Sequence, residues 1–187
     1  KGPEAMMQAG RHAGFDRELQ AGDEAGLRQF ARLCVRKGVT TATDLASPLP
    51  DDAVDMMLSV TGEDRFPARI VPFRRFVGMT PRALIDRAIE LRPRSTDRLR
   101  LGAVKMFADG SIQGFSARLR WPGYYNGQPN GLWYVTPEQL AEGLALALAA
   151  GVLVHVHTNG DEATALVLDT LEEVLRRQPG PDHRFTL

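Results

Sequence analysis

Two apolar stretches of the sequence carry the side chains whose types and spacing could do chemistry. Residues 101–109, LGAVKMFAD, place Lys105 in the middle of an apolar run that ends in Asp109. Residues 152–157, VLVHVH, place His155 and His157 two positions apart. A Lys among apolar neighbours loses its proton more easily than a solvated one, and neutral imidazole is the commonest metal ligand. The two stretches therefore predict amine chemistry at Lys105 and metal binding at the imidazoles.

Each of these residues also has a structural interpretation that the sequence leaves open. Lys105 could lie on an edge strand and reach solvent, or pair with Asp109 or another acid. A His-x-His pair is more often two core histidines bonded to neighbours than a ligand pair. For Asp161, which opens a predicted helix, we favour a structural role, because an acid in the first turn stabilises the helix dipole.

Helices and strands are predicted to alternate along the chain. Helical spacing of apolar residues, and caps such as Thr136 followed by Pro137, indicate the helices. Short runs rich in β-branched residues indicate the strands. The predicted helices are 23–37, 51–60, 80–91, 136–150 and 161–177, with a short one near 3–8, and the predicted strands are 39–45, 68–73, 101–109, 152–157 and a run from 183.

Alternation of this kind is typical of parallel strands joined by crossover helices. No Gly-rich phosphate fingerprint opens a helix, which disfavours a dinucleotide fold. Two architectures therefore fit, a doubly wound open sheet and a (β/α) barrel, and we favour the barrel, because 187 residues with five predicted strands make up most of the roughly 250 residues of a full barrel. Residues 1–187 would be part of one barrel catalytic domain with its N- and C-terminal portions missing, since the chain lacks an initiating Met and stops as an apolar run begins. In such folds the chemistry lies at the carboxyl ends of the strands.

Composition excludes several classes of partner. The chain has 187 residues, 43% of them hydrophobic, with 23 basic and 23 acidic side chains. A balanced charge gives no reason to expect nucleic acid or a membrane surface as partner. The single cysteine, Cys34, excludes a disulfide framework, so a cytoplasmic location is the default expectation. No segment is long and apolar enough to suggest a membrane span.

Three sequence blocks resemble the YtcJ-like (amidohydrolase 3) branch of the amidohydrolase superfamily. They are LGAVKMFADGSIQGFSARL, GVLVHVHTNGDEATALVLDTLEEV and the final HRF, and an earlier GVTTATDL resembles the second strand of that family. The order, spacing and strand placement of the two central blocks agree with the family pattern. The resemblance runs from about residue 38 to the end of the chain.

This resemblance implies an α/β fold, a partial (β/α)8 TIM-like barrel of the metal-dependent hydrolase type. It also implies hydrolysis of amide or other C–N bonds, in which a metal-activated water attacks a carbonyl. Lys105 matches the fourth-strand Lys that can be carboxylated by CO2, and His157 matches the fifth-strand metal ligand. The cofactor would be a divalent metal, with zinc the first choice for imidazole and carboxylate-like ligands. His155 stands where the family more often has an aliphatic residue, and it is a candidate second-shell group.

Other parts of the family pattern fall outside the sequence. The His-x-His of the first strand would precede Lys1, and the sixth-strand His would follow Leu187. The general acid/base Asp is also expected beyond Leu187, so we assign no catalytic residue within the chain. The parent protein would be the enzyme, and the fragment alone would be inactive.

The segment between residues 111 and 134 is rich in aromatic side chains and could shape a pocket for a small-molecule substrate. Trp121 and Tyr124, together with His155 and Asp109, are the candidate second-shell or substrate-binding residues. Packing of these aromatics onto their own loop is an equally good interpretation. Two alternatives also stand: a non-catalytic (β/α) binding or interaction module, and a lyase that uses Lys105 as a Schiff base. A homo-oligomer is left open.

Overall fold

The computed structural model describes residues 23–180 and 182–187. The short helix predicted near residues 3–8 lies outside the described residues. Ten elements follow one another along the described chain, in the order α3 (Glu24–Arg36), β1 (Thr41–Ser47), α4 (Asp51–Thr61), β2 (Arg69–Arg75), α5 (Pro81–Leu91), the 3-10 turn η1 (Arg92–Arg94), β3 (Ala103–Phe107), α6 (Pro137–Ala150), β4 (Val154–His157) and α7 (Asp161–Arg177). Strand and helix therefore alternate as the sequence predicts.

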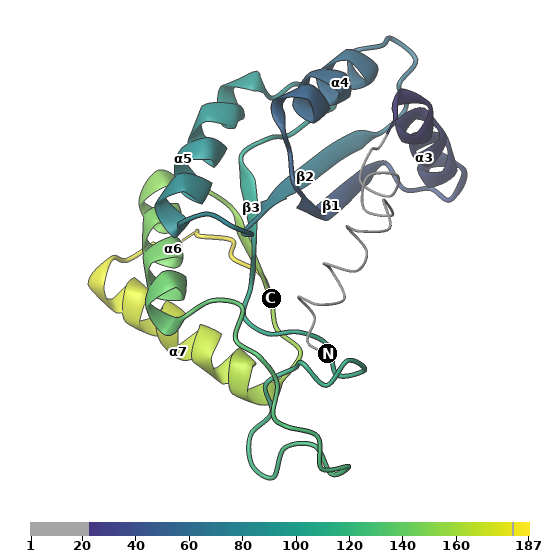
Figure 1. Ribbon diagram of the computed structural model, residues 1–187. Helices are drawn as coiled ribbons and strands as arrows, with labels where there is room; N and C mark the ends of the chain where they lie inside the picture. Colours follow the sequence, from purple (N-terminus) through teal and green to yellow (C-terminus); the bar gives the residue numbers. More distant parts are fainter. Residues whose placement is uncertain (1–22, 181) are drawn as a thin grey trace. The chain divides into compact units, whose positions relative to one another are not determined.

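The strands of the described residues form one sheet in the order β1-β2-β3-β4 (Figure 1). β2 pairs with β3, and β3 with β4, both in parallel. Each strand is followed by at least one helix before the next strand begins, which is the connection that parallel neighbours require. The predicted parallel α/β organisation is confirmed.

The described chain separates into two compact units. The first comprises residues 23–43, 49–71 and 96–100 and holds α3 and α4, where Arg28 Nε donates to both carboxylate oxygens of Glu63 at 3.0 and 3.2 Å. The second comprises residues 44–48, 72–95 and 101–187 and holds α5, α6, α7, β3 and β4. All candidate site residues of the sequence analysis lie in the second unit.

The core of the second unit lies between its strands and its helices. Alternate residues of β3 and β4 are fully buried, among them Val104, Met106, Val154 and Val156. They pack against the apolar stripes of α5, α6 and α7, which lie along one side of these strands (Figure 1). Because side chains alternate along a strand, this packing leaves the other set of β3 and β4 side chains on the opposite face.

Local sequence signals account for where the helices begin and end. Thr136 accepts from the backbone N–H of Gln139, whose side chain accepts from the N–H of Thr136, so a capping box opens α6. Gly151 closes the same helix with φ 59°, a left-handed conformation that glycine adopts without strain. Asp23 caps α3, because its side chain accepts from the backbone N–H of Gly26.

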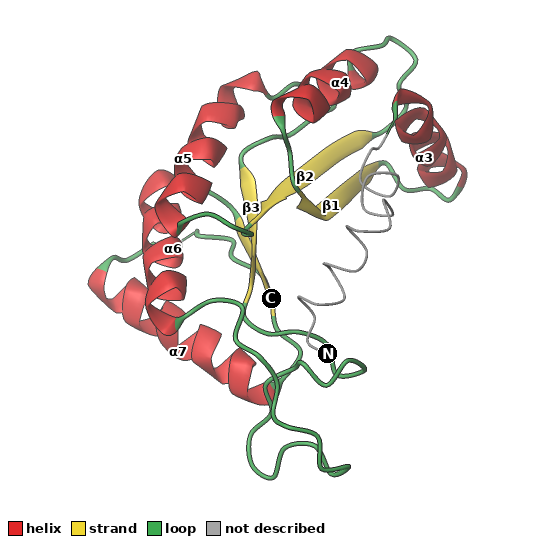
Figure 2. Ribbon diagram, viewed as in Figure 1, coloured by secondary structure: helices red, strands yellow, loops and turns green. Residues whose placement is uncertain are grey.

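Three predicted strands are shorter than the apolar runs that indicate them, and one of these is the run 152–157, which pairs only over Val154–His157. The run 101–109 forms a strand only over Ala103–Phe107, and the run from residue 183 contributes a single parallel bridge, between His155 and Thr186. Residues 108–136 connect β3 to α6 without helix or strand (Figure 2). Among the described residues, none of the helices combines the length and the apolarity that crossing a membrane requires.

Candidate functional site

The side chains of β3 and β4 that point away from α5, α6 and α7 bring the predicted chemistry together. Lys105 is in register with His155, and Phe107 with His157. These four side chains alternate with the buried apolar set, so they share one face of the sheet. Lys105 is only 5% exposed, whereas both histidines are half-buried.

Lys105 lies in an apolar setting that favours the neutral amine. Its Nζ is 3.3 Å from Nδ1 of His155 and 5.4 Å from the centre of the Phe107 ring. Burial lowers the pKa of Lys105. Burial also lowers the pKa of His155, and the charge of Lys105 lowers it further. Within residues 23–180 and 182–187, no carboxylate forms an ion pair with Lys105, so the predicted alternative of an Lys105–acid pair has no partner there.

The imidazole of His157 is held at the carboxyl end of β4. Its Nε2 lies 3.1 Å from the carbonyl oxygen of Gly110 and 3.1 Å from Nδ2 of Asn159. The same Asn159 amide donates to Gly110 O at 2.9 Å. With its proton on Nε2 the ring donates to Gly110 O and Nδ1 keeps the lone pair that a metal ligand needs, whereas with its proton on Nδ1 the ring accepts from the Asn159 amide at Nε2.

Asp109 is a fully buried carboxylate that three backbone N–H groups satisfy. Its Oδ1 accepts from Asn159 at 2.9 Å, and its Oδ2 accepts from Arg118 at 2.9 Å and Gly160 at 2.8 Å. Its charge adds to burial in raising the pKa of Tyr134. Both oxygens thus accept from backbone donors, and Asp109 has a structural role at the start of the connection between β3 and α6.

The aromatic side chains of the long connection behave differently from one another. Trp121 is 94% exposed. Tyr124 packs edge-to-face on Phe115, with ring centres 5.3 Å apart, and its hydroxyl donates to the oxygen of Ala117 at 3.0 Å. Trp133 lies against the Arg118 guanidinium, 4.9 Å from ring centre to Cζ. Tyr124 therefore packs within its own loop, and Trp121 is free to contact another molecule.

Further polar contacts fasten this connection to the start of α7. Glu162 accepts from the Arg118 guanidinium at 3.0 Å and from the Asn130 amide at 3.1 Å. Asp161 accepts from the backbone of Arg120 at 2.9 Å and of Glu162 at 3.0 Å. Asp161 has the structural role favoured from the sequence.

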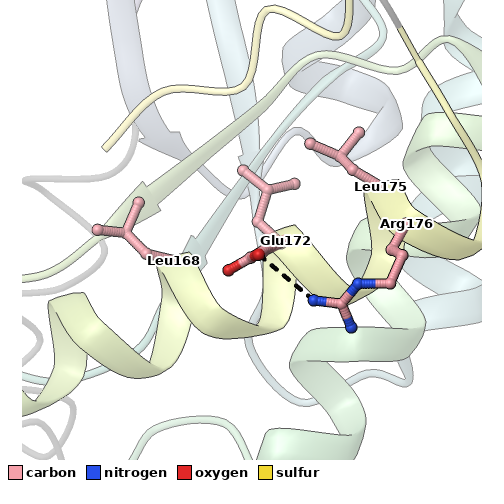
Figure 3. A pocket seen from close by; sticks show the side chains of 5 residues that line it. Leu168, Glu172, Leu175 and Arg176 are labelled. Atoms are coloured by element: carbon pink, nitrogen blue, oxygen red, sulfur yellow. Dashed lines mark hydrogen bonds and ion pairs between the residues drawn. The ribbon is translucent and has the colours of Figure 1, made fainter.

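A surface hollow on α7 lies apart from these residues. It is lined by Leu168, Leu171, Glu172, Leu175 and Arg176, and an ion pair of 3.3 Å joins Glu172 to Arg176 across it (Figure 3). None of the candidate site residues lines this hollow, which therefore plays no part in the site on β3 and β4.

The side chains on β3 and β4 are of types that bind divalent metals, but they are too few for a complete catalytic site. Imidazole nitrogens and a carboxylated amine are suitable ligands for zinc. A catalytic zinc needs three protein ligands, and the described part of the chain holds no group of three or more His, Cys, Asp or Glu side chains arranged to bind an ion. Lys105 and His157 can therefore form only part of a ligand set.

Three residues that the sequence analysis did not discuss make polar contacts here: Asn159 at His157, and Arg118 and Glu162 within the fastening of the long connection to α7. The side chain of Asn159 contacts both Gly110 and His157. Arg118 and Glu162 were not singled out. The available signal was the segment HTNGDE, which places one amide-bearing and two acid-bearing residues within five positions of His157, at the carboxyl end of a strand.

Polar side chains at the carboxyl ends of adjacent parallel strands, with helices on the other face, are the arrangement of (β/α)-barrel enzymes. Comparison with known proteins identifies the family. The model of the amidohydrolase family matches residues 5–187, and the chain belongs to that family.

Two relatives show how much of a complete protein the chain represents. It is 29% identical over 170 residues to Protein LONG AFTER FAR-RED 3 of Arabidopsis thaliana, covering 86% of this chain and 29% of that protein. It is 34% identical over 89 residues to YtcJ of Bacillus subtilis (strain 168), covering 48% of this chain and 17% of that protein. The chain thus spans less than a third of the length of these relatives.

Two solved structures share the fold. An uncharacterized metal-dependent hydrolase from Pyrococcus furiosus superposes with a TM-score of 0.63 at 23% identity, over 81% of this chain and 31% of that one. A second, from Pyrococcus horikoshii OT3, gives a TM-score of 0.61 at 19% identity over the same shares. The predicted partial (β/α)8 TIM-like barrel is confirmed.

Proposed function

We propose that this chain supplies Lys105 and His157 to the metal centre of a hydrolase that cleaves amide or other C–N bonds of a small molecule. The observation that carries the proposal is the setting of Lys105, which is 5% exposed, has a lowered pKa and lies on the same face as His157. Membership of the amidohydrolase family supports it. Zinc as the metal, a cytoplasmic location and a single barrel catalytic domain that extends beyond residues 1–187 belong to the same proposal.

The chemistry of Lys105 follows from its burial. A neutral amine can add to CO2, forming an N–C bond and releasing a proton, and the carbamate then offers anionic oxygen to a cation. Burial lowers the pKa of the amine and so raises the fraction that can react. A bound divalent ion lowers the pKa of a water molecule and polarises a carbonyl group. The remaining ligands and the general acid/base would come from parts of the protein beyond this sequence.

The test uses the complete natural protein. We expect it to bind zinc and to hydrolyse at least one member of a panel of N-acyl and cyclic amide substrates. Replacement of His157 by Ala should remove most of the metal, whereas Glu172→Gln on the outer surface of α7 should leave the metal content unchanged. A wild-type protein that binds no divalent ion would contradict the proposal.

Carboxylation of Lys105 is tested separately. With 13C-labelled bicarbonate, the wild-type protein should show one carbamate carbon resonance by NMR that is missing in Lys105→Met. Trapping of a carbonyl compound on Lys105 by borohydride would instead favour the Schiff-base lyase.

A further inference from the structure

The two polar atoms that contact Nε2 of His157 belong to the chain neighbour of Asp109 and to a residue that is hydrogen-bonded to Asp109. Nε2 of His157 contacts the oxygen of Gly110 and the side-chain amide of Asn159, each at 3.1 Å. Gly110 follows Asp109 directly in the chain, and the backbone N–H of Asn159 donates to Asp109 Oδ1 at 2.9 Å. Gly110 is thus joined to Asp109 by a peptide bond and Asn159 is joined to it by a hydrogen bond, so both residues that contact Nε2 are linked directly to Asp109.

This carboxylate joins three segments that are distant in sequence. Its hydrogen bonds reach Arg118, nine residues on, and Asn159 and Gly160, 50 and 51 residues on. A buried anion is costly unless hydrogen bonds satisfy it, and three backbone donors do so here. Loss of the carboxylate would leave these N–H groups without their partner, so the three segments depend on it.

The backbone packs too closely at this junction for larger residues. A Cβ on Gly160 would lie 1.7 Å from the oxygen of Arg118, and a Cβ on Gly110 would lie 2.2 Å from Oγ of Ser116. Neither position therefore has room for a larger side chain. The peptide group that carries the Gly110 oxygen is also hydrogen-bonded, because the N–H of Ser111 donates to Oγ of Ser116 at 2.9 Å.

We propose that Asp109 is a positioning residue for His157: its carboxylate clamps the end of β3, the loop at Arg118 and the β4–α7 turn together, and this clamp sets the Gly110 oxygen and the Asn159 amide against the imidazole. The proposal deepens the proposed function and rests on it where metal binding is concerned. Asp109 itself touches neither Lys105 nor a reacting group, because backbone donors occupy both of its oxygens.

The experiment compares Asp109→Asn with Glu162→Gln in the complete natural protein. The Asn side chain has only one oxygen that can accept, so its NH2 group would face one of the backbone N–H donors. Glu162→Gln weakens the hydrogen bonds that residue 162 accepts from the side chains of Arg118 and Asn130 in the same loop, and these bonds do not involve His157. The readouts are the 15N NMR signals of the His157 ring in the metal-free protein, and the dissociation constant for Zn²⁺.

Asp109→Asn should shift the His157 ring signals and weaken Zn²⁺ binding by about 10- to 100-fold, the usual effect of losing a group that orients a ligand. Glu162→Gln should change neither readout. Unchanged His157 signals in Asp109→Asn, or an equal shift in both variants, would overturn the proposal. If the wild-type protein binds no Zn²⁺, the proposed function fails, yet the ring signals still decide the role of Asp109.

Asn159→Ala is the second variant to be measured, and it replaces Asp109→Asn if that protein does not fold. It keeps the backbone N–H that Asp109 accepts and removes only the side-chain amide beside Nε2. The circular dichroism spectrum should stay that of the wild type while the His157 ring signals move. A folded Asn159→Ala protein with wild-type ring signals would contradict the proposal.

Discussion

At the scale of the residue, the unusual feature is the buried amine of Lys105, to which the sheet offers few polar partners. Nζ of Lys105 meets one imidazole nitrogen at 3.3 Å and an aromatic ring, and its side chain is 5% exposed. Keeping the ammonium form in such a place is unfavourable. A function that uses the neutral or carboxylated amine explains why a Lys stands there.

Replacement of Lys105 by Met separates this functional role from a structural one. With a chelator present, the free energy of unfolding of the complete protein should stay equal or rise by about 1 kcal/mol, since an apolar side chain replaces a poorly compensated amine. Zn²⁺ binding should fall at least about 10-fold. Urea denaturation and a metal-binding titration measure the two effects. A loss of stability of about 3 kcal/mol or more would show that the amine is structural.

At the scale of the element, the connection between β3 and α6 is fastened to the start of α7 rather than lying free. Backbone of Arg118 and Gly160 is in contact without room for a Cβ, and Glu162 binds the Arg118 side chain by an ion pair of 2.9 Å. The loop over the strand ends therefore has a defined conformation, which a pocket for a small molecule requires.

Gly160→Ala should separate the loop from the turn. The added Cβ meets backbone atoms that cannot rotate away, so we expect a loss of about 3 kcal/mol in unfolding free energy and faster proteolysis within residues 110–135. Gly123→Ala is the matched control: its φ is 76° and nothing lies near its Cβ, so only backbone strain of about 1 kcal/mol should appear. Equal losses in the two variants would contradict the close contact at Gly160.

At the scale of the whole molecule, the chain spans 29% of its Arabidopsis relative and 31% of the Pyrococcus furiosus structure. In the proposed function Lys105 and His157 supply part of a metal-ligand set, and other strands of the complete barrel supply the rest. A metal held by several strands would stabilise the folded state of the complete protein, because the unfolded chain lacks the assembled site.

Removal of the metal should therefore lower the Tm of the complete protein. At a metal concentration 100 times the dissociation constant, binding contributes about 2.7 kcal/mol. Differential scanning calorimetry before and after treatment with a chelator measures this effect, and added Zn²⁺ should restore the original Tm. The same Tm in both states would indicate that no metal bridges the strands.

The sequence by itself determined the order of helices and strands, the parallel sheet and the family. Caps, apolar periodicity and the VKMFADG and VHTNGD blocks are local signals, so they can be interpreted without knowing which segments meet. The face shared by Lys105 and His157 also follows from strand alternation once the two strands are neighbours.

Only the tertiary structure decided what each side chain contacts. The approach of Lys105 to His155 depends on the register of β3 and β4, and the three donors on Asp109 come from residues up to 51 positions away. Strand lengths were overestimated because an apolar run continues past the last paired residue. Spatial contacts between distant segments leave no local pattern, and for that reason the role of Asp109 could not be assigned from spacing.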